Sequence, residues 1–508
     1  MSRTTELLVT IVLSASAALC GAATDEALPG RRPWPKDGWP TSTPEEQGID
    51  SRKLVATLDS IRAARDRIHS LTIVRNGYVV LDAAFFPYEP GGLHDLASCT
   101  KSFTSALVGA AIGKGLIRGV WQPILELFPR HAVSGGDPRK RDILVEHLLT
   151  MTSGLNCGLV PGEVEMFQQQ GSRDWVQFAL NLEMAQPPGA GFAYCSPGVH
   201  LLAGTIQETS RMSPLEFARE NLLEPLGIKD VIWPADPQGV NCGSGDLRLR
   251  PLDMARFGYL YLRRGEWDGT RLLPEEWVVE SFKPYFEFPD QPNQLHRGYG
   301  YLWWLWPGVY WANGRGGQVI AVWPEKDMVV VMTGGGYRAQ DILLSHILPA
   351  AVADQPLPED REALDLLQAR IDEAKRAPSP SPVPSLPPMA GRISGKTYRL
   401  GPNWIGLRSL RLTFSGGEAR MDTTLRQEPL SLAVGLDNVY RISPGRFGLP
   451  AGCRGSWKSD SVFVAELDEI GNNAYWRMTM TFTGDRLVVD IQEGTGLPGV
   501  KAEGRADP

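Results

Sequence analysis

The sequence predicts an α+β fold: an antiparallel sheet flanked by helices, with an inserted helical subdomain, followed by a small C-terminal all-β domain. Strand-like runs lie near both ends of the first part, around 70–81 and 300–332, and mostly helical sequence lies between them. A Pro- and Ser-rich segment at 377–389 then separates this part from a region of alternating strands.

The strands of the first part are marked by their turns. Within 70–81, two apolar runs are joined by Asn76-Gly77, the strongest short signal for a hairpin. Three further runs, at 300–306, 319–323 and 328–332, are separated by glycine-rich or Pro-Glu-Lys-Asp turns. Strands at both ends of one domain favour a sheet that is assembled from both termini around the helices.

The C-terminal part has a different pattern. An acidic amphipathic stretch at 359–376 leads into the Pro- and Ser-rich linker, and beyond it two alternating runs at 475–482 and 487–491 flank a Gly-Asp turn. We therefore expect four segments along the chain. They are a signal peptide at 1–23, the α+β domain at 43–352, a helix and linker at 353–389, and the β domain at 390–505.

Composition restricts the possible partners. The chain is 43% hydrophobic and 21% charged, and its formal net charge is -7 without a long basic run. These values predict packed cores and argue against a nucleic-acid partner. The seven histidines show no metal-binding spacing, so we expect no metal and no cofactor. A small-molecule substrate is the expected partner, and the oligomeric state stays open.

The first residues resemble a targeting segment. Arg3 precedes an apolar stretch from Leu7 to Leu19, and small residues follow it before Asp25. We expect export to the periplasm or the exterior and no stable membrane span, because the stretch is short. Of the five cysteines after Cys20, Cys157 and Cys242 lie in loop-like sequence and are candidates for a disulfide in an oxidising compartment.

A Ser-x-x-Lys pair opens the most apolar helical stretch of the first domain. Ser98 and Lys101 precede apolar residues at helical spacing from Leu107 to Leu116, so both fall in the first turn of a buried helix. Positions three apart share a helix face, and a buried amine can take the proton of a neighbouring hydroxyl. Backbone N–H groups at the helix start can stabilise an oxyanion. The alternative interpretation is that Ser98 and Lys101 are surface residues in an ordinary first helical turn.

Two more segments supply candidate partners for this pair. Tyr194 and Ser196 lie in a Pro- and Gly-rich loop before a helical stretch, and a simply packed tyrosine is the alternative there. The run Gly314-Arg315-Gly316-Gly317-Gln318 is a glycine-rich turn that leads into a strand. Such glycines let a strand edge approach a substrate, and their N–H groups can complete an oxyanion hole.

Four motifs in this order resemble those of class C β-lactamase and penicillin-binding-protein-like serine hydrolases, in the branch of esterases and 6-aminohexanoate-dimer hydrolases. The motifs are Ser98-Cys99-Thr100-Lys101, the run from Leu148 to Leu155, Tyr194-Cys195-Ser196, and Gly314-Arg315-Gly316-Gly317-Gln318 followed by Pro324-Glu325-Lys326. The resemblance covers about 43–352 and implies a β-lactamase/transpeptidase-like fold. It also implies an enzyme that forms an acyl-serine intermediate.

The resemblance implies a role for each candidate residue. Ser98 is the expected nucleophile, and Lys101 and Tyr194 are expected to share its proton. The Ser98 N–H is expected to be one oxyanion donor, with the second on the strand edge near Gly316 to Gln318. The supporting candidates are Ser196, Arg315, Gly316, Gly317 and Gln318.

Two departures from the family pattern bear on the substrate. Ser196 stands where most relatives have asparagine, and the chain lacks the Lys-Thr-Gly triplet that helps hold a β-lactam carboxylate, a task that Arg315 could take over. We therefore expect cleavage of carboxylic esters or amides. A β-lactamase, a D-amino-acid peptidase and a non-catalytic binding protein with the same fold are the alternatives. No Gly-x-Ser-x-Gly elbow occurs, which argues against an α/β-hydrolase.

Overall fold

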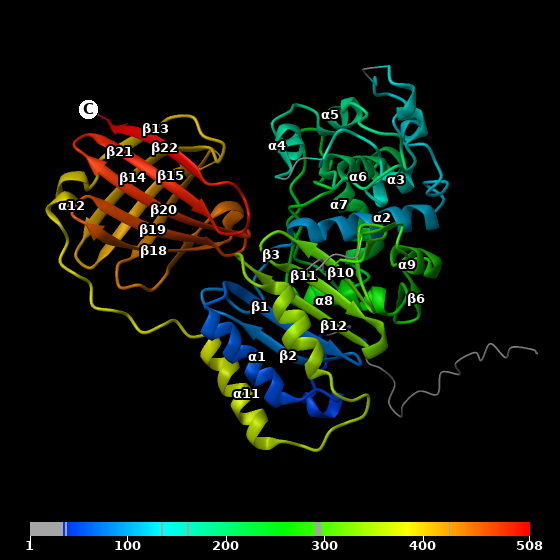
Figure 1. Cartoon of the computed structure of the whole chain (residues 1–508), viewed down its shortest axis with the longest axis horizontal. Helices are drawn as coiled ribbons and strands as arrows, with labels where there is room; N and C mark the ends of the chain where they lie inside the picture. Colours follow the sequence, from blue (N-terminus) through cyan, green and yellow to red (C-terminus); the bar gives the residue numbers. More distant parts are fainter. Residues whose placement is uncertain are drawn as a thin grey trace, which may run out of the picture. The chain divides into compact units, whose positions relative to one another are not determined.

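The computed structural model describes residues 34–35, 38–133, 136–159, 162–289, 296–425 and 427–507 (Figure 1). The expected signal peptide at 1–23, with Cys20, lies outside these residues. In the part of the chain that is described, no helix combines the length and the apolar character that a membrane crossing requires.

An eight-stranded antiparallel sheet forms the centre of the N-terminal part, in the order β2-β1-β12-β11-β10-β9-β8-β7. Its strands are β1 (Ile68–Arg75), β2 (Tyr78–Ala84), β7 (Phe286–Glu287), β8 (Gly298–Tyr299), β9 (Trp304–Trp306), β10 (Val309–Gly314), β11 (Gln318–Trp323) and β12 (Met328–Gly334). β1 pairs with β12, with Leu71 opposite Met332, so strands from the two ends of this part are neighbours in the sheet. The predicted assembly from both termini is confirmed.

The turn between β1 and β2 explains how the sheet begins. Asn76 and Gly77 have φ values of 53° and 85°, the left-handed conformation that a two-residue hairpin turn needs at both positions. Asparagine and glycine adopt it at low cost. The predicted hairpin is therefore confirmed, with Arg75 opposite Tyr78 at its end.

Helices cover both faces of the sheet because its strands alternate apolar side chains between two cores. On one face α1 (Ser51–Ala64) and α11 (Arg361–Ala374) pack side by side (Figure 1). On the other face α8 (Pro251–Leu262) packs against β11 and β12. Along β12, Val330 belongs to the first core and Val331 to the second.

The predicted helical subdomain lies between β2 and β7 in the sequence. Its helices are α2 (Thr100–Gly113), α3 (Val145–Leu149), α4 (Val164–Gln170), α5 (Trp175–Asn181), α6 (Ser196–Ser210), α7 (Pro214–Ala218), α8 and α9 (Glu275–Ser281). α2 packs against α6, and nearly all its residues are buried on every side. An all-round apolar helix of this kind belongs in the middle of a core.

The acidic stretch expected at 359–376 forms α11, whose first turn is capped by the Asp360 carboxylate accepting from the Ala363 N–H at 3.0 Å. The following residues 377–385 are exposed, as expected of a Pro-rich linker. A short helix, α12 (Pro388–Ile393), then leads into the C-terminal domain.

The C-terminal domain is all β, as predicted. Ten strands follow the order β16-β15-β14-β13-β22-β21-β20-β19-β18-β17, and a pairing of β16 with β18 closes the sheet into a barrel. The strands are β13 (Thr397–Leu400), β14 (Leu407–Ser415), β15 (Glu418–Leu425), β16 (Glu428–Gly435), β17 (Arg441–Pro444), β18 (Pro450–Ser459), β19 (Val462–Glu469), β20 (Ala474–Thr483), β21 (Arg486–Glu493) and β22 (Val500–Ala506). Closure removes the free edges that a sheet of this size would otherwise expose.

Candidate active site

Ser98 lies in the 3-10 turn η2 (Ala97–Cys99), which runs directly into α2. The short strand β3 (His94–Asp95) leads into this turn, and the Asp95 carboxylate accepts a hydrogen bond from the Ala97 N–H at 2.8 Å. Ala97 has a φ of 45°, a conformation that a non-glycine residue adopts only at a cost in free energy. The chain is thus bent sharply just before Ser98, and the α-helix itself begins two residues later.

Lys101 is almost completely buried on α2, with 1% of its surface exposed. Its Nζ lies 2.8 Å from Ser98 Oγ and 2.8 Å from the Ser244 carbonyl oxygen. The Ser244 carbonyl therefore holds the amine in place while it contacts the serine hydroxyl. This pairing of Ser98 with Lys101 has the geometry that the sequence spacing anticipates.

Tyr194 completes a cluster with this pair. The Lys101 Nζ lies 4.8 Å from the centroid of the Tyr194 ring, and the ring of Trp304 stacks on the tyrosine with its centroid at 5.8 Å. Burial raises the pKa of Tyr194, whereas the Lys101 charge and contact with Ser98 act to lower it and the Glu163 charge raises it further. The net shift is upward, so the hydroxyl keeps its proton at neutral pH.

Ser196 is the first residue of α6 and is buried. Its hydroxyl donates to the Glu163 carboxylate at 3.1 Å, which places a negative charge beside Tyr194. Sequence reasoning missed Glu163, which lies in a loop and belongs to none of the recognised motifs. No sequence pattern links Glu163 to Ser196, which follows it 33 residues later.

The predicted glycine-rich turn joins β10 to β11 and lies beside Ser98. A Cβ atom on Gly314 would come within 2.5 Å of the Leu96 carbonyl oxygen, so only glycine permits this close approach of β10 to η2. Gly316 and Gly317 both have left-handed φ values, 82° and 95°. The turn therefore lies against the segment that carries Ser98, and within it the Gly317 N–H donates to the Gly314 carbonyl at 3.2 Å.

Gln318 supports this turn from inside the core. The side chain is fully buried. Its Nε2 donates to the Gly334 carbonyl at 2.7 Å and to the Arg315 carbonyl at 3.1 Å, and its Oε1 accepts from the Gly334 N–H at 3.0 Å. The Gln318 amide is thus hydrogen-bonded to the backbone of the sheet and of the turn.

The suggested role of Arg315 as a carboxylate binder for substrate does not fit its position. Its guanidinium donates to Thr495 Oγ1 and lies 3.7 Å from the buried carboxylate of Glu493. Both partners belong to the C-terminal β domain. Arg315 therefore already has an anionic partner within the protein, which the sequence of the first domain could not reveal.

The disulfide differs from the pair considered from the sequence. Cys157 is bonded to Cys195, and Cys242 is a buried free cysteine, as are Cys99 and Cys453. Cys195 caps the start of α6 and lies between Tyr194 and Ser196, so the disulfide ties this loop to the segment around Cys157. Sequence reasoning had assigned Cys195 to the active-site motif and overlooked it as a bonding partner.

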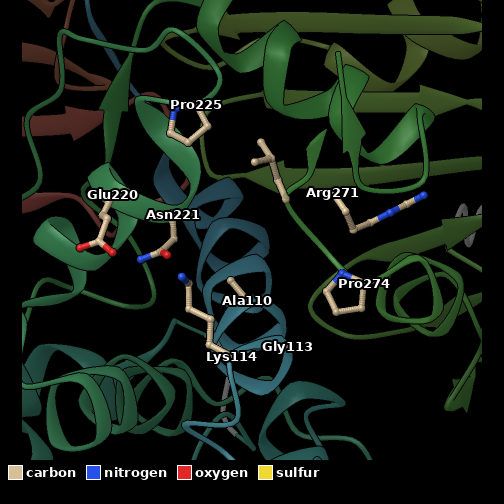
Figure 2. Close-up of a pocket in the computed structure, with 9 residues that line it drawn as sticks. Ala110, Gly113, Lys114, Glu220, Asn221, Pro225, Arg271 and Pro274 are labelled. Atoms are coloured by element: carbon tan, nitrogen blue, oxygen red, sulfur yellow. The ribbon is translucent and has the colours of Figure 1, made fainter. Parts of the chain in front are cut away.

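A separate pocket of about 460 Å³ lies at the other end of α2 (Figure 2). Ala110, Gly113 and Lys114 line it together with Asn221 and Arg271. With a rise of about 1.5 Å per residue, Gly113 lies about 18 Å along the helix from Lys101. The pocket is therefore distinct from the Ser98 cluster.

Among the described residues, no group of three or more His, Cys, Asp or Glu side chains is arranged to hold a metal ion.

Comparisons with known proteins agree with the motifs. The model of the Beta-lactamase family matches residues 61–334, more than half of the chain. Esterase EstB of Burkholderia gladioli is 25% identical over 46% of this chain and 65% of its own length. The 6-aminohexanoate-dimer hydrolase of Paenarthrobacter ureafaciens is 24% identical over 47% and 63%. Each match thus spans just under two thirds of the relative.

A solved structure supports the likeness at the level of the fold. EstCE1, described as a hydrolase with promiscuous acyltransferase activity, superposes with a TM-score of 0.50 at 14% identity. The match covers 61% of this chain and 99% of that one. At this identity the comparison bears on the fold alone.

Proposed function

This chain belongs to the Beta-lactamase family, and from that premise we propose that it is a serine hydrolase that cleaves carboxylic esters or amides through an acyl-enzyme on Ser98. The observation that carries the proposal is the 2.8 Å contact between the buried Lys101 Nζ and the partly exposed Ser98 Oγ. A serine hydroxyl is a weak nucleophile until a base takes its proton, and the lysine amine is within reach of that proton.

Acylation begins when Ser98 Oγ attacks the carbonyl carbon of the substrate. Its proton passes to the unit formed by Lys101 and Tyr194, and the carbonyl π bond opens to give a tetrahedral oxyanion. When the oxyanion collapses, the bond to the leaving group breaks and that group takes a proton from the same unit. Burial keeps Tyr194 protonated at rest, so its hydroxyl can relay the proton between Ser98, Lys101 and the leaving group.

The oxyanion is stabilised by backbone N–H groups. The Ser98 N–H lies in the bend ahead of α2, and the β10–β11 turn provides a second donor beside it. Hydrolysis of the acyl-enzyme reverses the proton transfers. Water loses a proton to the Lys101 and Tyr194 unit, attacks the ester carbonyl, and Ser98 leaves with that proton returned to it.

Two features of the site support simple esters or amides as substrates over β-lactams. The chain has no Lys-Thr-Gly triplet, and the Arg315 guanidinium faces Glu493 and Thr495. The esterase and amide hydrolase among the relatives also support this substrate class.

The proposal is tested by comparing the full-length protein with its Ser98→Ala variant on p-nitrophenyl butyrate and on a chromogenic cephalosporin. We expect ester hydrolysis by the unmodified protein, loss of turnover in the variant, and a higher kcat/KM for the ester than for the cephalosporin. A cephalosporin turned over faster than the best simple ester would make β-lactamase the better description. Absence of hydrolysis with every acyl donor would favour a binding protein.

We also propose that the protein is exported to the periplasm or the exterior. The apolar segment near the N-terminus and the Cys157–Cys195 disulfide both support this localisation, since disulfides persist in oxidising compartments. Fractionation of the native host, followed by non-reducing mass spectrometry of the Cys157 peptide, tests it. A reduced protein in the cytoplasm is the contrary result.

A further inference from the structure

The tip of the β19–β20 hairpin in the β domain is completely buried. It consists of Ile470, Gly471, Asn472 and Asn473, and the exposed fractions of its two asparagines are 4% and 0%. Hairpin tips ordinarily face water, because a buried turn must find partners for its polar groups. This tip finds those partners in the domain that carries Ser98.

Two of its contacts hold the chain that leads to Ser98. The Gly471 carbonyl accepts from the Asp95 N–H at 2.9 Å, and the Asn472 side-chain oxygen accepts from Arg248 Nε at 3.0 Å. Arg248 lies on the short strand β4 (Arg248–Leu249), which pairs with β3. Asp95 in turn accepts from the Ala97 N–H, so the tip supports the bend immediately before Ser98.

Asn473 contacts the opposite side of the site. Its Nδ2 donates to the Arg315 carbonyl at 2.7 Å, and its Oδ1 accepts from Gln318 Nε2 at 3.0 Å. A Cβ atom on Gly316 would lie 2.0 Å from Asn473 Oδ1, so the turn and the asparagine fit together only because residue 316 is glycine. The asparagine itself adopts a left-handed φ of 51°, which this residue type tolerates better than most.

These contacts fix the direction of a backbone N–H. In a planar trans peptide the C=O and the following N–H point in opposite directions. A hydrogen bond to the Arg315 carbonyl therefore also orients the Gly316 N–H, at the turn beside Ser98. Donors that are already oriented stabilise an oxyanion without reorganising during the reaction.

We propose that Asn473 is a positioning residue for the hydrolase reaction, and that the β domain is thereby part of the catalytic apparatus. Asn473 fixes the β10–β11 turn in the orientation that the oxyanion requires. The inference rests on the proposed function, because it assigns a task within that reaction. It also means that the residues before the linker do not complete the site alone.

The test uses the full-length protein and two substitutions. Asn473→Ala removes both side-chain hydrogen bonds. Asn473→Asp keeps the shape and the acceptor for Gln318 but, when ionised, loses the donor to the Arg315 carbonyl. The matched control is Thr423→Val, which removes a buried hydrogen bond from Thr423 Oγ1 to the Ser409 carbonyl, 2.8 Å long, between β15 and β14 of the same domain.

The measured quantities are kcat and KM for p-nitrophenyl butyrate, with near-ultraviolet circular dichroism as the check of tertiary structure. We expect both Asn473 variants to keep a native spectrum and to lose about tenfold to a hundredfold in kcat, with KM changed by less than about threefold. Thr423→Val should lower the melting temperature and leave kcat unchanged. A residue that only stabilises the fold of the β domain would behave like Thr423.

Each contrary outcome has its own meaning. An Asn473→Ala variant with native structure and unchanged kcat overturns the inference, as does loss of native structure in both variants, which would make Asn473 a folding residue. These outcomes leave the proposed function intact as long as the unmodified protein hydrolyses the ester and Ser98→Ala does not. Failure of the unmodified protein with every acyl donor would overturn the proposed function itself.

Discussion

Lys101 Nζ lies 2.8 Å from Ser98 Oγ and 4.8 Å from the centroid of the half-buried Tyr194 ring. If Lys101 and Tyr194 act as one unit in proton transfer, Lys101→Ala and Tyr194→Phe should each slow acylation by about a hundredfold or more. The double variant should be scarcely slower than the poorer single one, because either loss disables the unit. Stopped-flow acylation with an activated ester measures this. Independent, multiplying effects would show that the groups act separately.

The Glu163 charge should be visible in the pH profile. This carboxylate raises the pKa of Tyr194, so Glu163→Gln removes an upward influence and makes deprotonation of the tyrosine easier. The alkaline limb of the kcat/KM profile, where the tyrosine loses the proton that it relays, should therefore move to lower pH, while glutamine can still accept from Ser196. Glu165→Gln is the matched control, since Glu165 accepts from the Gly158 N–H nearby. If Glu163→Gln and Glu165→Gln give the same pH profile, the Glu163 charge does not affect the pKa of Tyr194.

The Cys157–Cys195 disulfide should stabilise the loop that carries Tyr194. Its half-cystines are 38 residues apart, and closing a loop of that length contributes about 4 kcal/mol through the unfolded state. A Cys157→Ser, Cys195→Ser double variant should melt at a lower temperature and lose esterase activity at a lower temperature than the parent. Cys453→Ala, which removes a buried free thiol, is the control. Unchanged melting of the double variant would contradict the expectation.

Acid should destabilise the protein through His94. Burial, together with the neighbouring His69, lowers the pKa of His94 to about 3, whereas an unfolded histidine titrates near 6.5. Between these values the unfolded chain binds a proton that the folded protein does not. The free energy of unfolding should therefore fall with pH, from pH 6.5 to pH 3, by at most about 1.4 kcal/mol per pH unit.

His94→Gln tests this acid sensitivity, because the side-chain amide can still form a hydrogen bond with His69 Nδ1, which lies 3.0 Å from His94 Nε2. Urea unfolding between pH 6.5 and pH 4 should give a smaller slope for the variant than for the parent. Burial raises the pKa of the Asp95 carboxyl, so its contribution to the free energy of unfolding changes with pH in the opposite direction. The parent and the His94→Gln variant both contain Asp95, so this contribution does not affect the comparison. An identical slope in parent and variant would contradict the assignment to His94.

The local features of the fold and site could be predicted from the sequence. The Asn76-Gly77 hairpin and the helical spacing of Ser98 and Lys101 depend on neighbours in the chain, which periodicity and turn chemistry describe well. The sheet assembled from both termini also followed, because strand-like runs bounded a helical region.

The remaining features depend on distant pairings that local patterns do not encode. Arg315 was considered as a carboxylate binder because of its place in the glycine-rich turn, and local patterns could not predict its contact with Glu493 of the C-terminal domain. Asn473 follows Arg315 by 158 positions and has no catalytic motif around it. Glu163 and the Cys195 partner of Cys157 likewise depend on how loops meet in three dimensions. Such contacts are set by tertiary packing, so only the structure reveals them.

The most direct test of the account is covalent labelling of the nucleophile. The full-length protein is treated with a fluorophosphonate probe, digested, and mapped by mass spectrometry, with Ser98→Ala as the control. The account predicts a single phosphonylated site at Ser98 and slower labelling in Lys101→Ala, because the amine activates that hydroxyl. Labelling of a different serine, or undiminished labelling of the Ser98→Ala protein, would contradict the assignment of Ser98 as the nucleophile.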